Sequence, residues 1–287
     1  MAGAEPDELG EFTKAKDDVA ARRITTRKDL KEAFTRLGVS RGMSLMLHAA
    51  MTPLGYVVNG PHDVIEAVLD CIGPDGTMLV SANTSQLTDP AEWKAPPVPP
   101  EWVETIRRHM RPFDPRTTLI RGRGILPLTF LLYPDVHRSN HPVKSIAAKG
   151  KLAQHITSEH PLHESEGVGS PMHKLYLAKG YALLVGVDLV HCTPIHLAEF
   201  LADVPYLYKD NFKALVPNAA GQNEFVALKK YPVTSKYFYK LQEPLKAAGF
   251  LKESRFHDCP VFLLDVFNSV NFVVEILKRE NYFLLSP

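Results

Sequence analysis

The chain has few cysteines, no long apolar run and almost no net charge. Its three cysteines, Cys71, Cys192 and Cys259, are far apart, which excludes a disulfide framework and a clustered zinc motif and is typical of reduced thiols. No apolar segment reaches the roughly 18 to 20 residues that a membrane-spanning helix needs. The acidic N-terminus does not have the basic and then apolar pattern of a secretory signal. We therefore expect a cytoplasmic protein that does not associate with membranes.

Two further absences narrow the function. The net charge is +1 and no basic cluster stands out, so nucleic acid is not an expected partner. The sequence contains neither a GxGxxG nor a Walker phosphate loop, which argues against enzymes that use dinucleotides or ATP. With 287 residues, 45% of them hydrophobic, the chain is long enough to bury a sizeable core.

The chain divides into an arm and one domain. Residues 1–22 are polar and have few apolar anchors, which predicts a flexible N-terminal arm. We expect residues 23–287 to form a single domain. Within it, residues 86–123 include the proline-rich segment PAEWKAPPVPPEW, which cannot form regular structure. We predict that this excursion lies over the site as a lid or wall.

The first part of the domain alternates between strands and helices. Thr26 is placed to cap a helix with one apolar face, and the segment MSLMLHAAM predicts a buried strand. HDVIEAVLDCI has a helical apolar stripe, and TMLVSANTS predicts the next strand. A strand, helix and strand with short connections favour a parallel pair. We interpret residues 137–150 as a loop. In the last third we expect strands in KALVPN, EFVALKKYPV and CPVFLLDVFN, with two more helices.

One segment, residues 181–200, combines a buried strand with a candidate base. The apolar run from Ala182 to Val187 predicts the strand, and Thr193 and Pro194 predict a helix start. His196 would then be the third residue of that helix, with Glu199 three residues later on the same face. The positive potential at a helix N-terminus disfavours imidazolium, which suits a general base. Alternatively, His196 is a buried histidine bonded to a carbonyl, and Glu199 lies on a solvated face.

Several segments together resemble the aminoglycoside 3-N-acetyltransferase family. They are HAAMTPLGYVVNGPHDVIEAVLDCIGPDGTMLV, WKAPPVPPEW with PFDP after it, RSNHPVKSIAA, EGVGSP and IHLAE, in the family's order and spacing. The resemblance implies an α/β protein, a three-layer α/β/α sandwich around a largely parallel central sheet, with additional strands in the C-terminal third. It also implies acetyl transfer from acetyl-CoA to an amine of an aminoglycoside or a related small amine, with acetyl-CoA as co-substrate and no metal.

The resemblance also assigns roles to individual positions. It implies catalytic roles for His196 as general base and for the adjacent Glu199. Contacts to the coenzyme are implied for His48, Ala49, Ala50, Val58, Asn59, Gly60, Arg121, Ser139, Asn140 and Ser145. Contacts to the acceptor are implied for Asp114, Glu166 and Glu199.

The chain departs from the family pattern at two places. It has Val190-His191-Cys192-Thr193 where the family usually has Asp-x-Asn-Thr, so the aspartate that would orient the base is absent in register. Asp188 or His191 could take its place. The first strand ends in His-Ala-Ala rather than His-Ser-Ser or His-Ala-Ser, which removes a hydroxyl beside the coenzyme. We expect these changes to affect the rate of acetyl transfer and the choice of acceptor more than the fold.

Several residues have alternative interpretations. Cys192 is either a nucleophile near two histidines or a small buried side chain. His160, with His163 and Glu164, suggests a metal site or only a turn. His141-Pro142 is a structured turn or a coenzyme contact. Asp114 before Pro115 and Glu166 beside a glycine are turn residues or acceptor ligands.

Two functional hypotheses follow. In the first, the protein is an N-acetyltransferase in which an amine attacks the thioester directly, with His196 as base; its acceptor is an aminoglycoside or a different amine. In the second, it is a catalytically impaired homologue that binds coenzyme A as a scaffold. The aromatic residues of FYKLQ and NYFLL are typical of a core or a subunit contact, so a homodimer is possible.

Overall fold

The computed structural model describes residues 23–94, 96–208, 212–218, 220–232 and 234–286. The predicted N-terminal arm, residues 1–22, lies outside the described residues. A seven-stranded sheet forms the centre, with the strand order β10-β11-β7-β2-β4-β6-β5. The bounds of its strands, in that order, are β10 (Leu251–Phe256), β11 (Cys259–Asp265), β7 (Tyr181–Val185), β2 (Ser44–Ala49), β4 (Thr77–Ser81), β6 (Ile146–Gly150) and β5 (His137–Arg138).

The predicted α/β sandwich is confirmed, but the direction of the strands corrects the expectation of a largely parallel sheet. β2 pairs in parallel with β4 and with β7, in the register Leu45 to Met78 and Leu47 to Leu183. The pairings of β4 with β6, β6 with β5, β7 with β11 and β11 with β10 are antiparallel. The strand-helix-strand unit predicted the parallel centre, whereas the outer strands arrive through other connections.

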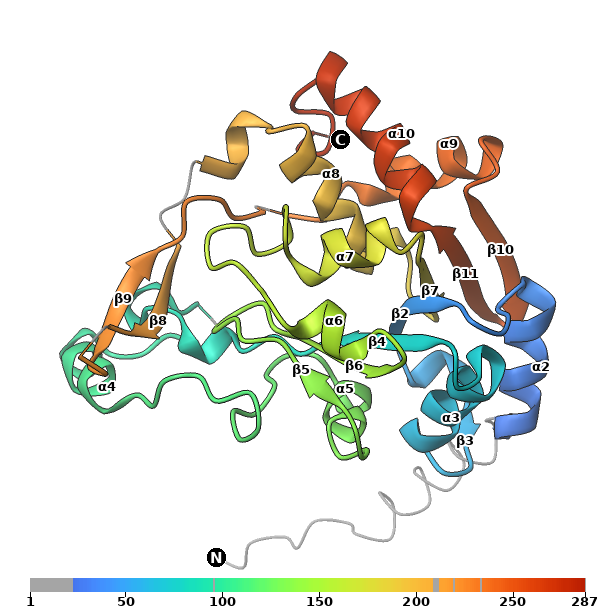
Figure 1. Ribbon diagram of the computed structural model, residues 1–287, viewed down its shortest axis with the longest axis horizontal. Helices are drawn as coiled ribbons and strands as arrows, with labels where there is room; N and C mark the ends of the chain where they lie inside the picture. The colour runs from blue at the N-terminus through green and yellow to red at the C-terminus, as the bar shows by residue number, and fades with distance from the viewer. Residues whose placement is uncertain (1–22, 95, 209–211, 219, 233, 287) are drawn as a thin grey trace, which may run out of the picture.

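Helices cover both faces of the sheet (Figure 1). One face carries α2 (Arg27–Leu37), α3 (Pro61–Ile72) and α5 (Ile125–Phe130); the other carries α6 (Ala153–Thr157), α7 (Pro171–Leu177), α8 (His196–Leu201), α9 (Gln242–Ala247) and α10 (Val266–Arg279). Side chains alternate along a strand. Leu45 and Leu47 therefore pack into the core on the face of α2, α3 and α5, and Met46 packs into the core on the opposite face. The three layers follow from this alternation, with apolar residues on both faces of the central strands.

The remaining elements are short. They comprise β1 (Ile24–Thr25), β3 (Tyr56–Val57), α4 (Val103–His109), the hairpin of β8 (Lys213–Pro217) and β9 (Asn223–Ala227), and the 3-10 turns η1 (Thr52–Leu54), η2 (Ser85–Leu87), η3 (Pro90–Glu92), η4 (Pro100–Trp102), η5 (Leu189–His191), η6 (Thr193–Ile195), η7 (Pro205–Tyr208) and η8 (Phe238–Leu241). The hairpin lies beside α4 at the left of Figure 1, and Asn223 donates its side-chain amide to the carbonyl of Met110 (2.7 Å). Within the described part of the chain, no helix is long and apolar enough to cross a membrane.

Local sequence signals explain some element boundaries and miss others. Thr26 caps α2 as predicted, in a capping box with Asp29. Residues 137–150, predicted as a loop, contain strands β5 and β6, so that interpretation was wrong. β6 is only five residues long, and its sequence, IAAKG, gave no strand signal, although it pairs with β4 in the sheet. β10 was also missed, because four consecutive exposed residues hide its pairing with β11.

Candidate active site

The candidate site lies at the carboxyl ends of the parallel strands. Ala49, the last residue of β2, pairs with Val185, the last residue of β7. The chain then turns at Gly186, which has φ +65°. A Cβ at Gly186 would lie 3.2 Å from the carbonyl oxygen of Ala50 and 3.0 Å from the ring of Pro53, so the turn needs glycine. This edge of an α/β sheet is where polar groups from several loops converge.

The connection from β7 to α8 passes through two 3-10 turns. Asp188 accepts a hydrogen bond from the backbone N–H of Val190 (3.1 Å) and so caps the first turn. The second turn begins at Thr193, which corrects its predicted role as a helix cap: Cys192 precedes the turn and makes no side-chain cap bond. His196 is therefore the first residue of α8 rather than the third of a longer helix. Pro194, which predicted the start of the helix, lies instead in the first part of the second 3-10 turn.

His196 and Glu199 form a buried pair. Nδ1 of His196 lies 2.5 Å from Oε2 of Glu199, and the hydroxyl of Tyr206 donates to Oε1 of Glu199 (2.7 Å). Glu199 and Tyr206 are fully buried, and the ring of Phe238 lies 4.8 Å from that of His196. Burial, with the neighbouring Glu199, raises the pKa of Tyr206, so its hydroxyl stays a proton donor. The pair thus has a fixed geometry.

This geometry leaves one imidazole nitrogen available for chemistry. A carboxylate accepts hydrogen bonds, so Nδ1–H of His196 donates to Glu199, and in the tautomer that has its single proton on Nδ1 the lone pair is on Nε2. Glu199 is therefore the carboxylate that orients His196, whereas Asp188 contacts His191 (3.3 Å). Because the orienting group comes from α8 itself, the arrangement does not depend on the aspartate absent at Val190.

His196 borders a cavity of about 530 Å³. It is lined by Arg123, Lys144, Glu166, Val190, His191, Thr193, His196, Tyr231, Pro232, Thr234, Ser235 and Lys236. Its size suits a small-molecule site. Five separate parts of the described chain contribute to it: the residues just before α5, those just before β6, the loop before α7, the β7–α8 connection, and residues 231–232 with 234–236.

Glu166, one of the expected acceptor residues, lines this cavity as part of an ion pair. Its Oε1 lies 3.1 Å from Nζ of Lys144, and the side chains of Glu166 and Lys144 are only 4% and 11% exposed. Burial opposes ionisation, but Lys144, together with His196, holds the pKa of Glu166 below its ordinary value. The pKa of Lys144 is raised by Glu166 against the effect of burial. Oε2 of Glu166 is buried and has no hydrogen-bond partner among the described residues.

His48, the first expected coenzyme contact, has a similar open position. Its Nε2 is buried and unpartnered within the described chain. Burial, with repulsion from Arg123 and His191, lowers the pKa of His48 to about 3, so the ring is neutral at physiological pH. A neutral imidazole with a free ring nitrogen fits a coenzyme at the end of β2.

The other expected coenzyme residues fall into two groups. Ala49, Ala50, Val58, Asn59 and Gly60 flank the end of β2 and the start of α3, where Gly60 precedes Pro61 as N-cap. The backbone N–H and side-chain amide of Asn59 both donate to the Asp63 carboxylate (3.1 and 3.0 Å).

The second group stands on the strands β5 and β6 and their surroundings. The hydroxyl of Ser145 donates to the carbonyl of Ala82 (2.7 Å), and that of Ser139 contacts Nδ1 of His160 (2.8 Å). The backbone N–H of Arg121 bonds the carbonyl of Asn83 (3.1 Å), and Asn140 is exposed. The two serine hydroxyls are thus engaged within the protein. None of these residues lines the His196 cavity.

Asp114 also lies away from the His196 cavity. Its carboxylate accepts the backbone N–H of Arg116 (2.7 Å), and Thr118 bonds its backbone N–H (2.9 Å), as in a turn. It lines a separate cavity of about 650 Å³ within the segment 86–123, together with Trp93 and Met110. Of the described residues of that segment, only Arg123 lines the His196 cavity.

The alternative readings of other residues can be compared with the structure. Cys192 is fully buried, and burial raises the pKa of its thiol to about 12, which disfavours a thiolate nucleophile. His160 bonds Ser139 and the carbonyl of Ser165, and among the described residues no three His, Cys, Asp or Glu side chains group as metal ligands. His141 is buried and accepts the backbone N–H groups of Val143 and Lys144, as a structured turn requires.

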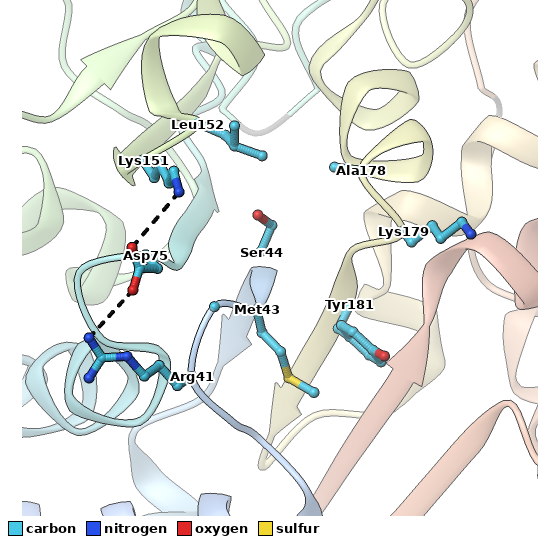
Figure 2. A pocket seen from close by; sticks show the side chains of 10 residues that line it. Arg41, Met43, Ser44, Asp75, Lys151, Leu152, Ala178, Lys179 and Tyr181 are labelled. Carbon is cyan, nitrogen blue, oxygen red and sulfur yellow. Dashed lines mark hydrogen bonds and ion pairs between the residues drawn. The ribbon is translucent and has the colours of Figure 1, made fainter.

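A third cavity, of about 490 Å³, lies at the opposite end of the parallel strands (Figure 2). It is bordered by Ser44 and Tyr181, the first residues of β2 and β7. Asp75 lies 3.4 Å from Arg41 and 3.8 Å from Lys151, and Figure 2 shows it between these two cations. Asp75 pairs with both Arg41 and Lys151, Lys179 is a further cation at this end, and no histidine lines the cavity. The His196 cavity is therefore the candidate active site.

Sequence reasoning missed Lys144, Tyr206, Tyr231 and Lys236, and it named Arg123 only as the end of the excursion. Lys144 follows a proline and a valine and precedes a buried strand. A lysine just before a buried strand was the one feature of the sequence that could have indicated it as a site residue. Tyr206 stands seven residues after Glu199, but α8 ends at Leu201, so helical spacing does not connect them. These residues come together only through tertiary structure.

An α/β sandwich with a histidine–carboxylate pair beside a cavity at the strand ends is typical of an α/β enzyme that acts on a small molecule. A family model described as aminoglycoside 3-N-acetyltransferase matches residues 46–278. The chain therefore belongs to the aminoglycoside 3-N-acetyltransferase family, as its motifs predicted.

Individual relatives agree with this assignment. The aminoglycoside N(3')-acetyltransferase-like protein YokD of Bacillus subtilis is 38% identical over 182 residues, 63% of this chain and 66% of that protein. Aminoglycoside N(3)-acetyltransferase III of Pseudomonas aeruginosa is 35% identical over 178 residues, 62% of this chain and 64% of that protein. These sequence matches span slightly less than two thirds of the relatives' lengths.

The structural matches are longer. The crystal structure of YokD has a TM-score of 0.85 at 30% identity, and the alignment covers 93% of this chain and 98% of that one. The structure of AAC-IIIb in a binary complex with CoASH has a TM-score of 0.76 at 30% identity, covering 92% of this chain and 100% of that one. The similarity in structure thus extends beyond the sequence motifs to most of the chain.

Proposed function

We propose that the protein transfers the acetyl group of acetyl-CoA to the amine of a small molecule, with Nε2 of His196 as the general base. The observation that carries this proposal is the buried His196–Glu199–Tyr206 network at the edge of the cavity. Membership of the family and the CoASH complex of AAC-IIIb support the co-substrate. The open Nε2 of His48 fits a coenzyme contact at the end of β2.

The reaction is a direct acyl transfer. The amine nitrogen attacks the thioester carbonyl carbon, the new carbon–nitrogen bond forms, and the carbon–sulfur bond breaks. Nε2 of His196 takes the proton from the amine, and this proton then passes to the leaving thiolate. An alkylamine is mostly protonated at pH 7, so a neutral base beside it raises the reactive fraction; such assistance typically contributes about 10²–10⁴-fold in rate. Glu199 positions the ring and stabilises the imidazolium.

Thiol release from acetyl-CoA tests the proposal. It is measured with a panel of aminoglycosides and simple amines, for the native protein and for His196→Ala. We expect turnover to fall about 10²–10⁴-fold in His196→Ala while binding of acetyl-CoA is kept. His191→Ala is the matched control, because it removes a second histidine from the same cavity but leaves the buried pair intact. We expect it to retain most of the activity.

Other outcomes would change the assignment. If His191→Ala loses the activity and His196→Ala keeps it, His191 is the base. Coenzyme binding without thiol release for any acceptor would favour the scaffold alternative. Turnover with simple amines and none with aminoglycosides would keep the chemistry and change the acceptor. The homodimer and the cytoplasmic location stay predictions.

A further inference from the structure

The charges around the His196 cavity are unusual for a site that accepts a polycation. Among the described residues that line it, Arg123, Lys144 and Lys236 are cationic, and Glu166 is the single carboxylate. Lys144 already neutralises Glu166 at 3.1 Å. The cavity therefore has an excess of positive charge before any histidine is protonated.

The two remaining cations are not neutralised by a carboxylate of the described chain, and Nζ of Lys236 lies over the ring of Tyr237, 5.4 Å from its centroid. Arg123 and Lys236 are exposed, and neither has a carboxylate partner among the described residues. Asp188, a nearby carboxylate, is instead engaged with His191 and the backbone of Val190. A cavity lined by unpaired cations attracts anions and repels further cations.

The backbone places Arg123 at the cavity. It stands between Gly122 and Gly124, which have φ of +72° and +73°, so both glycines adopt the left-handed conformation. The charge of Arg123 is close enough to lower the pKa of His48 and the pKa of Glu166. Arg123 thus lines the cavity and acts electrostatically on both His48, an expected coenzyme contact, and Glu166, an expected acceptor contact.

Glu166 offers a hydrogen-bond acceptor to a ligand in the same cavity. Its buried Oε2 has no hydrogen-bond partner in the described chain, although Oε1 is bonded to Lys144. An unsatisfied buried carboxylate oxygen is costly, so a donor from a ligand is expected there. The amine that His196 deprotonates is such a donor, because Glu166 and His196 line the same cavity.

We propose that the acceptor is a small amine that carries an anionic group, a carboxylate or a phosphate, rather than a polycationic aminoglycoside. Its amine lies between Glu166 and His196, and its anionic group contacts Arg123 and Lys236. This inference rests on the proposed acetyl transfer and names the substrate class of that same site. It explains why the cavity has a single, already paired carboxylate.

Matched acceptors test the proposal through thiol release from acetyl-CoA. The pairs are phosphoethanolamine against ethanolamine and β-alanine against propylamine, with gentamicin as the polycation. We expect each anionic amine to have a kcat/KM about tenfold or more above its neutral partner, as a charge-assisted hydrogen bond provides. The two pairs distinguish phosphate from carboxylate. A kcat/KM for gentamicin above those of both anionic amines would overturn the inference and leave the acetyl transfer standing.

Substitutions locate the effect. In Arg123→Gln and Lys236→Gln we expect the KM of the preferred anionic amine to rise about tenfold, and by more than the KM of its neutral partner or the KM of acetyl-CoA. Arg36→Gln, on the exposed face of α2, is the control for a general change of charge and should alter none of these. A rise confined to the KM of acetyl-CoA would assign these cations to the coenzyme and overturn the inference. No thiol release with any acceptor would remove both the proposed function and this inference.

Discussion

Nζ of Lys144 lies 3.1 Å from Oε1 of Glu166, and the two residues form a buried ion pair between the start of β6 and the loop before α7. Removing one partner of a buried pair leaves an uncompensated charge, whereas replacing both by apolar residues is often tolerated. The pair therefore joins two loops of the cavity wall. It also neutralises the carboxylate of Glu166, so that Glu166 does not add a net negative charge to the cavity.

Lys144→Met is expected to lower the free energy of unfolding by about 3–5 kcal/mol, because Glu166 stays buried without its counter-charge. Urea unfolding followed by circular dichroism measures the change. The double substitution Lys144→Met with Glu166→Leu should recover most of the loss. Lys28→Met, which breaks an exposed pair with Glu32 on α2, is the control and should cost less than about 1 kcal/mol. An equal cost for Lys144→Met and Lys28→Met would contradict the prediction.

Tyr206→Phe is expected to destabilise the protein by about 1–3 kcal/mol, because the buried Oε1 of Glu199 loses its hydrogen-bond donor. If Glu199 positions His196, kcat should fall while the KM of acetyl-CoA stays the same. Steady-state kinetics and urea unfolding test the two parts. Tyr208→Phe is a matched control, since Tyr208 donates to the exposed Asp203. A kcat unchanged in Tyr206→Phe would show that the tyrosine has no positioning role.

The free energy of unfolding should decrease as the pH falls from about 6.5 to about 3, partly because of His141. Burial, with repulsion from His160, lowers the pKa of His141 from 6.5 to about 3. In this window the unfolded chain binds a proton that folded His141 does not, so its contribution is full above pH 6.5 and is lost toward pH 3. A group that titrates only in the unfolded chain contributes a slope of about 1.4 kcal/mol per pH unit.

His141→Asn tests that assignment. Asparagine does not titrate, and its side-chain oxygen can accept the backbone N–H groups of Val143 and Lys144, which Nδ1 of His141 accepts at 3.1 and 2.9 Å. Unfolding curves between pH 4 and 7 should therefore have a shallower slope in the variant. His48 and His160 also have lowered pKa values, so part of the slope should remain. An unchanged slope would exclude a contribution from His141.

Much of the fold was predictable because it depends on neighbours in sequence. The Thr26 capping box, the apolar stripe of α3, and the buried segments that form β2 and β7 are all set by residues a few positions apart. The pair of His196 and Glu199 belongs to this group, since three residues of helix bring the two side chains together. Strands β6 and β10 were missed, because their pairing partners rather than their own residues define them.

The sequence by itself determined the family, the α/β class and the candidate base, because motifs and periodicity act over short spans of chain. Only the tertiary structure decided what surrounds that base. Tyr206 reaches Glu199 after the helix has ended, and Lys144 reaches Glu166 across 22 residues. Arg123 and Lys236 border the same cavity from distant segments. The charge of a site is the sum of groups that folding brings within a few ångströms, and sequence spacing does not report that sum.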